Sequence, residues 1–505
     1  MEKRIRRLGV FMLICFVALF VQLNNIQVLK ANSLATNPDN PREIAISLSQ
    51  PRGDIVSADG VTLARSVPAA SGPYKYQRVY NPKTAQLFAQ IVGYDTIFGT
   101  RTGVEAEYNN YLIAHTRPAT SLRDLLVNRT TTDNVTLTVD SHLQLQVAGI
   151  MDQVESSDHA PTDAAVVLNV KTGAVEAMYS NPTFDPNLLA STDGATVTAN
   201  YNSLDPGSAE SSLVSRSFQF GFIPGSTFKT VTSSAVYDHQ PALAAVDYPS
   251  VGCINVPQQV NQFCNYLGPN GHEQCGGTIQ QTLPASCNTA FAQMGMSLST
   301  SLAVEADAFG FNRQVPLDLP GVGVSNFPTA TELTGDDPLQ ASSAIGQGFG
   351  TSTVIATPLQ MALVAAGIAN QGVIMTPHVM QQIRDSQGDL VRTYSPTPWL
   401  TATSPATAAS VTALMQAVVT RGTASTVGFP ASWDVAAKTG TAETGTGNAT
   451  GSNLTNDWMI AFAPANNPKV AVAVVVPNQP GSQTGASTSG PPMKAILGDA
   501  LGLTP

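Results

Sequence analysis

The sequence predicts an α+β protein with an antiparallel sheet covered by helices, a smaller N-terminal domain and one transmembrane helix. Three observations lead to this prediction: one long apolar run near the start, strand patterns at residues 164–178 and 470–476, and helical patterns between those strands. A length of 505 residues suggests two or three domains. We expect an anchor over residues 1–30, an N-terminal domain over residues 31–155 and a larger domain over residues 156–505.

The apolar run begins after Arg7 and continues without a charged residue as far as Lys30. A helix of this length crosses a hydrocarbon core of about 30 Å. Residues 1–7 carry a formal charge of +3, which favours a cytoplasmic N-terminus and an exported remainder. The alternative is a cleaved signal peptide. We favour the anchor, because no small-residue cleavage site follows a shorter apolar core.

Composition narrows the class of protein further. Charged residues make up 12% of the chain, hydrophobic residues make up 43%, and the net charge is −10. Disorder driven by charge is excluded because so many residues are apolar, and a polytopic membrane protein is excluded because only one long apolar run exists. Beyond residues 1–7 the chain carries a formal charge of −13, which would repel phosphate, so no nucleic-acid partner is expected.

Four cysteines follow the anchor within a short stretch, and an even number in an exported chain predicts disulfides. These cysteines are Cys253, Cys264, Cys275 and Cys287, which allow three connectivities. The sequence leaves open whether Cys287 is bridged or free. A zinc site with His272 is the competing interpretation, which we disfavour because no C-x-x-C pair is present.

Local patterns place the elements of the larger domain in order. Residues 135–139 alternate like a strand ahead of it, and residues 164–178 form two apolar runs around a Lys-Thr-Gly turn, which predicts a β-hairpin. Helical periodicity covers residues 357–366, where Thr357 can cap the first turn. Residues 470–476 are continuously apolar, which predicts a strand at the centre of a sheet. Three segments without core residues predict loops: 203–212, 444–456 and 478–492.

The most specific local motif is S-x-x-K, formed by Ser226 and Lys229 after a Pro-Gly turn. The two residues share one face of a helix, about 5–6 Å apart at Cβ. A lysine can remove the proton of a serine hydroxyl if burial and nearby positive charge lower the lysine pKa. Taken alone, the motif is equally compatible with an ordinary helix N-terminus.

Two further motifs follow. S-x-N occurs once, at Ser286 and Asn288, and offers a hydroxyl that can relay a proton and an amide that can hold a carbonyl. K-T-G at residues 438–440 supplies a fixed positive charge, a hydroxyl and a glycine that lets a substrate backbone come close to a strand. A second K-T-G at residues 171–173 fits the hairpin turn and receives a structural interpretation.

In the order S-x-x-K, S-x-N, K-T-G, the motifs form the set used by penicillin-recognising serine acyl-transferases. The chain resembles the class B penicillin-binding proteins, the monofunctional D,D-transpeptidases of the bacterial cell wall, and is most similar to actinobacterial members with a short N-terminal region. Other segments that carry the resemblance are Pro51 to Ile55, Arg101 to Glu105, Gly346 to Gly348 and Asp457 to Phe462. The resemblance implies the penicillin-binding serine transpeptidase fold, with residues 31–155 as a non-catalytic dimerisation or pedestal domain.

The resemblance also implies a role for each site residue. Ser226 would attack the D-Ala-D-Ala carbonyl, and Lys229 would be its general base. Ser286 would pass a proton to the leaving amine, and Lys438 would lower the pKa of the Lys229 ammonium. The remaining residues would bind substrate: Asn288 the donor carbonyl, Thr439 and Thr441 the terminal carboxylate, Gly440 the substrate backbone, and the N–H groups of Ser226 and Thr441 the oxyanion.

Partners follow from the same resemblance. We expect peptidoglycan stem peptides ending in D-Ala-D-Ala, β-lactam antibiotics, the plasma membrane, and a membrane glycan polymerase with other cell-wall synthesis proteins. No metal or cofactor is required by the scheme. The alternatives are a D,D-carboxypeptidase or β-lactamase that passes the acyl group to water, and a β-lactam sensor or scaffold of the same fold. A disulfide at Cys287, inside S-x-N, would shape the cleft.

Overall fold

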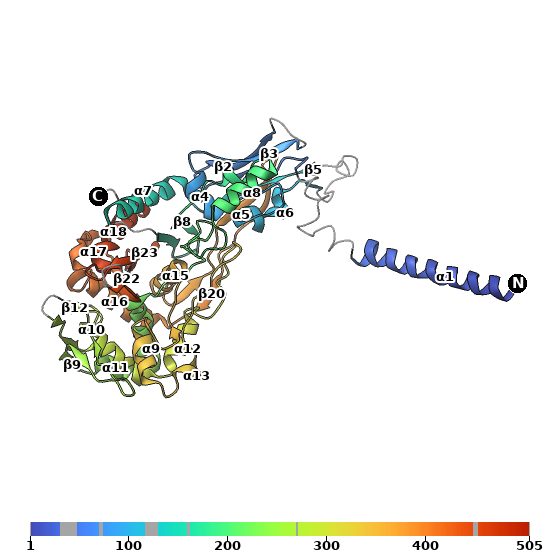
Figure 1. Cartoon of the computed structure of the whole chain (residues 1–505). Coiled ribbons are helices and arrows are strands. Elements are labelled where there is room, and N and C mark those ends of the chain that lie inside the picture. Colours follow the sequence, from blue (N-terminus) through green and yellow to red (C-terminus); the bar gives the residue numbers. More distant parts are fainter. Residues whose placement is uncertain are drawn as a thin grey trace.

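A computed structural model describes residues 2–30, 48–69, 74–116, 130–158, 162–268, 271–447 and 453–503 of the chain. Helix α1 (Glu2–Asn24) and the π-helical turn η1 (Asn25–Leu29) contain the predicted anchor. The helical span Lys3–Gln27 is long and apolar enough to cross a membrane, and none of its apolar window is buried in the protein. In Figure 1 this helix stands away from the folded body.

The core of the larger part is a five-stranded sheet with the order β21-β22-β23-β7-β8, in which neighbouring strands are antiparallel. Its strands are β7 (Asp163–Asn169), β8 (Val175–Asn181), β21 (Ala436–Gly447), β22 (Asn453–Ala463) and β23 (Val470–Pro480). The predicted hairpin and the predicted central strand are confirmed. Residues 470–477 are all buried because both faces of the sheet are covered, which explains their continuous apolar run.

Helices cover the two faces of this sheet, as the α+β prediction requires (Figure 1). One group packs on β22, β23 and β8 and consists of α7 (Ser141–Asp158), α17 (Gly485–Thr488) and α18 (Gly490–Ala500). A second group lies around α15 (Pro358–Ala369) and includes α9 (Lys229–His239) and α16 (Pro405–Arg421). Thr357 caps α15, accepting a hydrogen bond from Gln360 N, and every residue of the helix is buried.

A six-stranded sheet lies beside the first and joins segments far apart in the sequence. Its order is β19-β18-β6-β1-β2-β3. The strands are β1 (Ile55–Val56), β2 (Thr62–Pro68), β3 (Tyr76–Tyr80), β6 (Asp133–Leu137), β18 (Met380–Asp385) and β19 (Leu390–Thr393). The hairpin β18–β19 therefore extends a sheet whose other strands all come from residues before 138.

A buried ion network connects the two N-terminal motifs, Pro51 to Ile55 and Arg101 to Glu105, which carry part of the family resemblance. Glu105 accepts hydrogen bonds from Arg52 Nη2 at 2.8 Å and Arg78 Nε at 2.5 Å, and its side chain is fully buried. Burial alone would raise the pKa of Glu105, but the guanidinium groups of Arg78 and Arg52 outweigh it and lower that pKa. A buried charge without a partner has a large free-energy cost, and pairing reduces this cost. The ion pair between Arg52 and Glu105 therefore stabilises the packing of the two motifs against each other.

Two of the segments predicted as loops contain regular structure. Strand β21 continues to Gly447 and β22 begins at Asn453, while residues 448–452 lie outside the described part of the chain. After β23, Thr484 caps α17 with a capping box, and α18 follows. The predictions were wrong there because a hairpin ladder and a capped helical turn need few apolar side chains. Residues 204–212 form turns after α8 (Gly194–Ser203), as predicted.

A cysteine-rich arm, residues 248–277, projects beside α10 (Ile279–Thr282) and α11 (Asn288–Leu298) (Figure 1). It consists of three two-stranded ladders, β9 with β14, β10 with β11, and β12 with β13. These strands are β9 (Tyr248–Val251), β10 (Cys253–Ile254), β11 (Phe263–Cys264), β12 (Leu267–Gly268), β13 (Gly271–His272) and β14 (Cys275–Gly277).

Candidate active site

Ser226 lies in a short 3-10 turn, η4 (Gly225–Phe228), and α9 begins directly after it at Lys229. Gly225 has φ +53°, and a Cβ there would lie 2.8 Å from Ala442 Cβ on strand β21. The glycine thus lets the serine turn approach the sheet edge. The Ser226 side chain is half-buried, and its hydroxyl has no hydrogen-bond partner within the described residues.

Lys229 is completely buried and points from α9 towards the S-x-N motif. Its Nζ donates to Ser286 O at 2.6 Å and to Asn288 Oδ1 at 2.7 Å, and lies 3.3 Å from Ser286 Oγ. One face of this ammonium contacts an aromatic ring, because Phe291 lies with its centroid 5.4 Å from Nζ. The first two sequence motifs therefore meet at Lys229.

Ser286 is held in a left-handed backbone conformation, φ +58°, immediately before α11. Such a conformation is uncommon for a serine and turns its carbonyl and hydroxyl towards the two lysines. Lys438 Nζ donates to Ser286 Oγ at 2.9 Å and to Thr439 O at 2.8 Å. The Ser286 hydroxyl therefore lies between the Nζ atoms of two lysines, one from each of the other motifs.

The electrostatics of both lysines follow from this burial. Burial lowers the pKa of Lys229 well below its ordinary value, and the positive charge of Lys438 lowers it further. Burial lowers the pKa of Lys438 to about 7. The lowered pKa of Lys229 favours its neutral form, which has a free electron pair and can act as a base, whereas an ammonium cannot.

Strand β21 is an edge strand of the five-stranded sheet, so one row of its backbone groups faces away from β22. Gly440 brings this edge against the serine turn, because a Cβ there would lie 2.8 Å from Pro224 O and 2.9 Å from Thr227 Cγ2. The Thr439 and Thr423 hydroxyl groups are 2.6 Å apart, and Thr441 Oγ1 accepts from Gly485 N at 3.0 Å. Both threonines are thus held in place beside Lys438.

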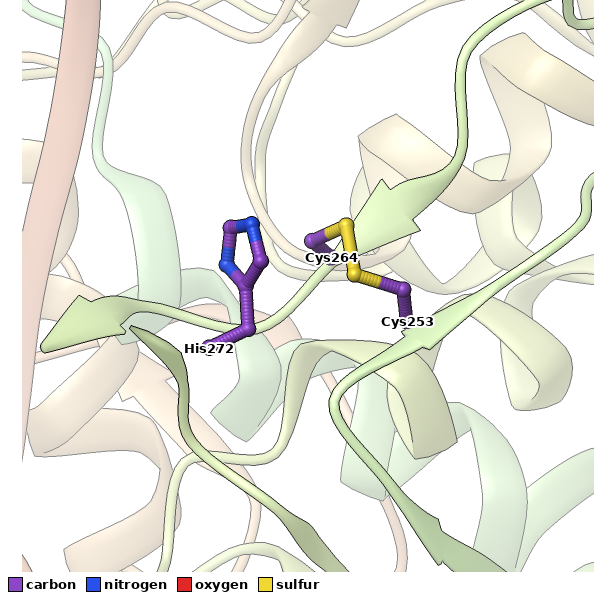
Figure 2. Close-up of side chains that lie close together, drawn as sticks. All are labelled: Cys253, Cys264 and His272. Carbon is purple, nitrogen blue, oxygen red and sulfur yellow. A yellow bond between two sulfur atoms is a disulfide. The ribbon is translucent and has the colours of Figure 1, made fainter. Parts of the chain in front are cut away.

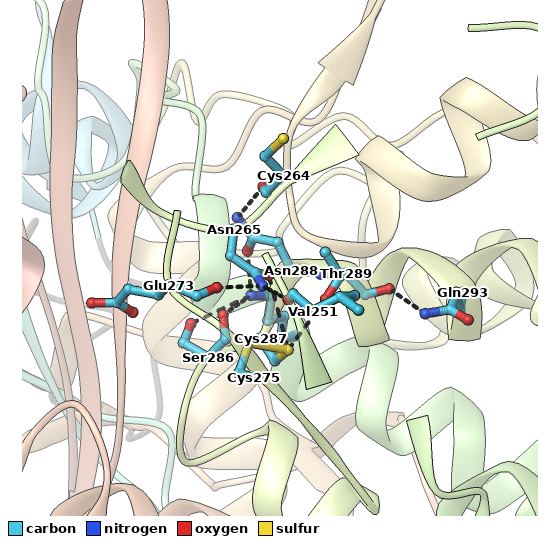
Figure 3. The surroundings of a disulfide bond; sticks show 11 residues. Val251, Cys264, Asn265, Glu273, Cys275, Ser286, Cys287, Asn288, Thr289 and Gln293 are labelled. Atoms are coloured by element: carbon cyan, nitrogen blue, oxygen red, sulfur yellow. Dashed lines mark hydrogen bonds between the residues drawn. A yellow bond between two sulfur atoms is a disulfide. The ribbon is translucent and has the colours of Figure 1, made fainter. Parts of the chain in front are cut away.

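Figure 3 shows that S-x-N is attached to the cysteine-rich arm through a disulfide, Cys275–Cys287. The hypothesis that Cys287 is bridged is confirmed in this structure. Asn265 adds a second attachment, since its Oδ1 accepts from Thr289 N at 2.9 Å and its Nδ2 donates to Val251 O and Glu273 O, each at 2.8 Å. The N-terminus of α11 is therefore fixed to the arm on two sides.

The other disulfide joins Cys253 to Cys264, and His272 lies close to it (Figure 2). These three residues belong to the cluster for which a zinc site was the competing interpretation of the sequence. Disulfide sulfurs are not thiolates and are poor metal ligands, so the bridged cysteines and His272 do not fit a zinc site. His272 Nδ1 instead lies 2.7 Å from Asn265 O.

The second K-T-G lies in the turn between β7 and β8, where Gly173 has φ +77°. Lys171 Nζ donates to Asn370 Oδ1 at 3.1 Å, far in sequence and structure from Ser226. The structural interpretation of this copy is confirmed.

Three residues that position the site were missed by sequence reasoning: Asn265, Thr423 and Gly485. Asn265 contacts Thr289 directly after S-x-N, Thr423 contacts Thr439, and Gly485 contacts Thr441 directly after K-T-G. None of the three stands in a motif of its own. Only the position of Asn265, next to Cys264 in the cluster of cysteines, offered a signal.

The geometry brings together a serine at the start of a helix, two buried lysines, a second hydroxyl and an open strand edge. This arrangement defines the class of serine acyl-transferases that use lysine rather than histidine as base. Comparison with known proteins agrees. Residues 164–498 match the penicillin-binding protein transpeptidase domain, and residues 52–135 match the penicillin-binding protein A dimerisation domain. The chain belongs to the penicillin-binding protein transpeptidase family.

Relatives cover the full length of the chain. The peptidoglycan D,D-transpeptidase PbpA of Mycolicibacterium smegmatis is 33% identical over 517 residues, with 99% of each chain covered. Its namesake from Mycobacterium tuberculosis is 32% identical with the same coverage. The structure of penicillin-binding protein A from M. tuberculosis as a ceftriaxone acyl-enzyme superposes with a TM-score of 0.77 at 29% identity, covering 90% of this chain and 99% of that one. The predicted fold is thereby confirmed.

Proposed function

We propose that the chain is a peptidoglycan D,D-transpeptidase that cross-links stem peptides through an acyl-serine intermediate on Ser226. The observation that carries this proposal is the convergence of Lys229 and Lys438 on the Ser286 hydroxyl beside the serine turn. The names of the full-length relatives support the same reaction.

In the first half of the reaction, neutral Lys229 takes the proton of Ser226 as Oγ attacks the penultimate D-Ala carbonyl. The C–O bond forms, and the tetrahedral intermediate then collapses with cleavage of the peptide C–N bond. Lys229 returns the proton through Ser286 to the departing amine, so that the terminal D-Ala leaves neutral at nitrogen. Lys438 stabilises the developing negative charge on Ser286 during this relay.

Other residues hold the donor in place. Asn288 binds the amide carbonyl of the donor, and the hydroxyl groups of Thr439 and Thr441 bind the terminal carboxylate. The N–H groups of Ser226 and Thr441 form the oxyanion hole, where loss of one donor costs about 3–4 kcal/mol. Gly440 leaves space for the substrate backbone along the edge of β21.

In the second half, an amine from a neighbouring stem peptide attacks the ester carbonyl. The same lysine and serine remove the proton of that amine and return it to Ser226 Oγ as the ester bond breaks. β-Lactams resemble D-Ala-D-Ala, and when the lactam C–N bond breaks on attack, the departing nitrogen stays attached to the acyl group. The acyl-enzyme therefore persists, as in the named complexes of the M. tuberculosis protein with ceftriaxone and penicillin G.

A fluorescent penicillin tests the proposal on the full-length protein in detergent. We expect covalent labelling of the unmutated protein and none of Ser226→Ala. Lys438→Ala should label at least about a hundredfold more slowly because the relay loses its cation. Lys171→Ala, which changes the other K-T-G, is the matched control and should label normally. Absence of label on the unmutated protein would refute the proposed chemistry.

Two alternatives are separated by the fate of that label. A carboxypeptidase or β-lactamase would lose the label within minutes as water attacks the ester, whereas a transpeptidase keeps it. A sensor or scaffold would keep the label but would not join a D-Ala-D-Ala donor peptide to an amine acceptor. Formation of the joined peptide by the unmutated chain, and not by Ser226→Ala, distinguishes an enzyme from a sensor.

The proposal also covers the membrane orientation of the chain and the roles of its domains. Helix α1 would anchor the chain in the plasma membrane with residues 1–7 in the cytoplasm and the rest outside, as their +3 charge favours. Residues 31–155 would form a non-catalytic dimerisation or pedestal domain, and residues 156–505 the transpeptidase domain. A membrane glycan polymerase would supply the strands to be cross-linked. Protease protection in inside-out vesicles tests the orientation.

A further inference from the structure

The cysteine-rich arm extends the wall of the site beyond Asn288. Asn288 Nδ2 donates to Cys264 O at 3.4 Å, so the amide that would hold the donor lies against the arm backbone. The next arm residues along the chain are Asn265, Tyr266 and Leu267. A group that continues past Asn288 along the arm therefore meets Tyr266 and Leu267.

Tyr266 also contacts a segment of the chain that lies beside Thr441. Its hydroxyl lies 3.5 Å from Gly481 O, on the segment that follows β23. Four residues later, Gly485 N donates to Thr441 Oγ1 at 3.0 Å. The contacts thus run from Thr441 through this segment to Tyr266 and, by way of the nearby Cys264, back to Asn288.

The two side chains are apolar and exposed, although their backbone is firmly held. Tyr266 is 37% and Leu267 is 64% exposed. Glu273 N donates to Tyr266 O at 3.0 Å, and Leu267 pairs with His272 in the β12–β13 ladder. Exposed apolar side chains on a fixed backbone beside a binding site are pre-organised to contact a ligand, because little entropy is lost on binding.

We propose that Tyr266 and Leu267 form an acyl-side specificity wall that contacts the donor chain beyond the amide held by Asn288. This inference rests on the proposed function, which sets the direction of the donor. With the terminal carboxylate on Thr439 and Thr441 and the donor carbonyl on Asn288, the acyl-side chain leaves the site past Cys264 O. The wall selects donors whose acyl-side substituent is apolar, and the long Tyr266–Gly481 contact is replaced when such a group enters.

Two penicillins that differ only in this substituent provide the test. 6-Acetamidopenicillanic acid and benzylpenicillin share the ring, the carboxylate and the side-chain amide, but only benzylpenicillin carries a phenyl ring beyond the amide. Second-order acylation rate constants are measured for both on the full-length protein in detergent. The variants are Tyr266→Ala, Leu267→Ala and Tyr266→Phe, with Val260→Ala as a matched control elsewhere on the arm, where that side chain is fully exposed.

We expect Tyr266→Ala to lower the rate constant for benzylpenicillin about two- to tenfold while leaving that for the acetamido compound unchanged. The quantity to compare is the ratio of the benzylpenicillin rate constant to the acetamido rate constant. Leu267→Ala should lower this ratio by a smaller factor than Tyr266→Ala. Tyr266→Phe should keep the ratio, because the ring rather than the hydroxyl provides the contact. The acetamido rate also reports whether each variant is correctly folded at Ser226.

Three results would overturn the inference. An unchanged ratio in both alanine variants would show that the wall does not contact the substituent. An increased rate for benzylpenicillin in Tyr266→Ala would make Tyr266 an obstacle rather than a binding surface. A ratio that changes equally in Val260→Ala would assign the effect to the arm as a whole. Failure of both penicillins to acylate the unmutated protein would instead refute the proposed function on which the wall depends.

Discussion

The two disulfides of the cysteine-rich arm allow stability and catalysis to be separated. Cys253–Cys264 closes a loop with a sequence separation of 11, and Cys275–Cys287 one with a separation of 12. Loops of this length predict a loss of about 3 kcal/mol in the free energy of unfolding when either bridge is removed. The two bridges therefore have equal expected effects on stability.

Their expected effects on the site differ. Cys287 stands between Ser286 and Asn288, which both contact Lys229. The Cys275–Cys287 bridge therefore holds the residues that would relay the proton. The Cys253–Cys264 bridge touches the site less directly, through the 3.4 Å contact of Cys264 O with Asn288 and through the neighbouring Asn265, which accepts from Thr289 N. A displacement of about 1 Å in a catalytic group costs about a hundredfold in rate. We expect acylation to fall tenfold to a hundredfold without the first bridge and to change little without the second.

The assay compares two double variants, Cys275→Ser with Cys287→Ser, and Cys253→Ser with Cys264→Ser. Urea unfolding of the full-length protein in detergent gives the stability loss, and acylation by 6-acetamidopenicillanic acid gives the rate without involving the acyl-side wall. A serine at position 287 would find a partner, because Thr289 Oγ1 lies 3.4 Å from Cys287 Sγ. Equal losses of acylation in both variants, or no loss in the first, would refute the reasoning.

Other predictions concern the lysines, the strand edge and the ion network. Lys438→Met removes a positive neighbour of Lys229 and so raises the Lys229 pKa, which should move the acidic limb of the acylation pH profile to higher pH. Gly440→Ala places a Cβ 2.8 Å from Pro224 O and should abolish labelling by fluorescent penicillin, while the far-ultraviolet circular dichroism stays unchanged. Glu105→Gln removes the carboxylate that Arg52 and Arg78 share, although Arg52 keeps its ion pair with Asp95, and should cost about 3–5 kcal/mol in urea unfolding, with labelling of the folded protein retained.

Elements with strong local patterns were predictable from the sequence. The hairpin β7–β8, the helix α15 and the central strand β23 each show a continuous apolar run or a capping residue, and each formed as expected. The addition of β18 and β19 to the six-stranded sheet was not predictable. That pairing joins residues about 250 positions apart through backbone hydrogen bonds, and no side-chain pattern in either segment specifies it.

The active site also combines features that the sequence predicts with features that it does not. Three motifs in order predicted which residues meet, because their chemistry is fixed by residue type. Their mutual placement depends on features without a sequence pattern, such as the left-handed conformation of Ser286 and the choice among three disulfide connectivities. The polar contacts of Asn265 and Thr423 were equally hidden, since an amide or hydroxyl finds its partner only once the fold brings it there.

Three acceptors surround Lys229 Nζ, namely Ser286 O, Asn288 Oδ1 and Ser286 Oγ, and the neutral amine of the proposed mechanism would donate to the two nearest. A neutral amine has two N–H bonds and one electron pair, and the two shortest contacts, to Ser286 O at 2.6 Å and Asn288 Oδ1 at 2.7 Å, both require a donor. The electron pair is then left for a hydroxyl proton. Since Lys438 donates to Ser286 Oγ, the Ser286 proton is free to turn towards Lys229 or towards a departing amine. The resting contacts among Lys229, Ser286 and Lys438 therefore already supply the path from Lys229 to the leaving group, and Ser226 would join this path when its hydroxyl meets Lys229.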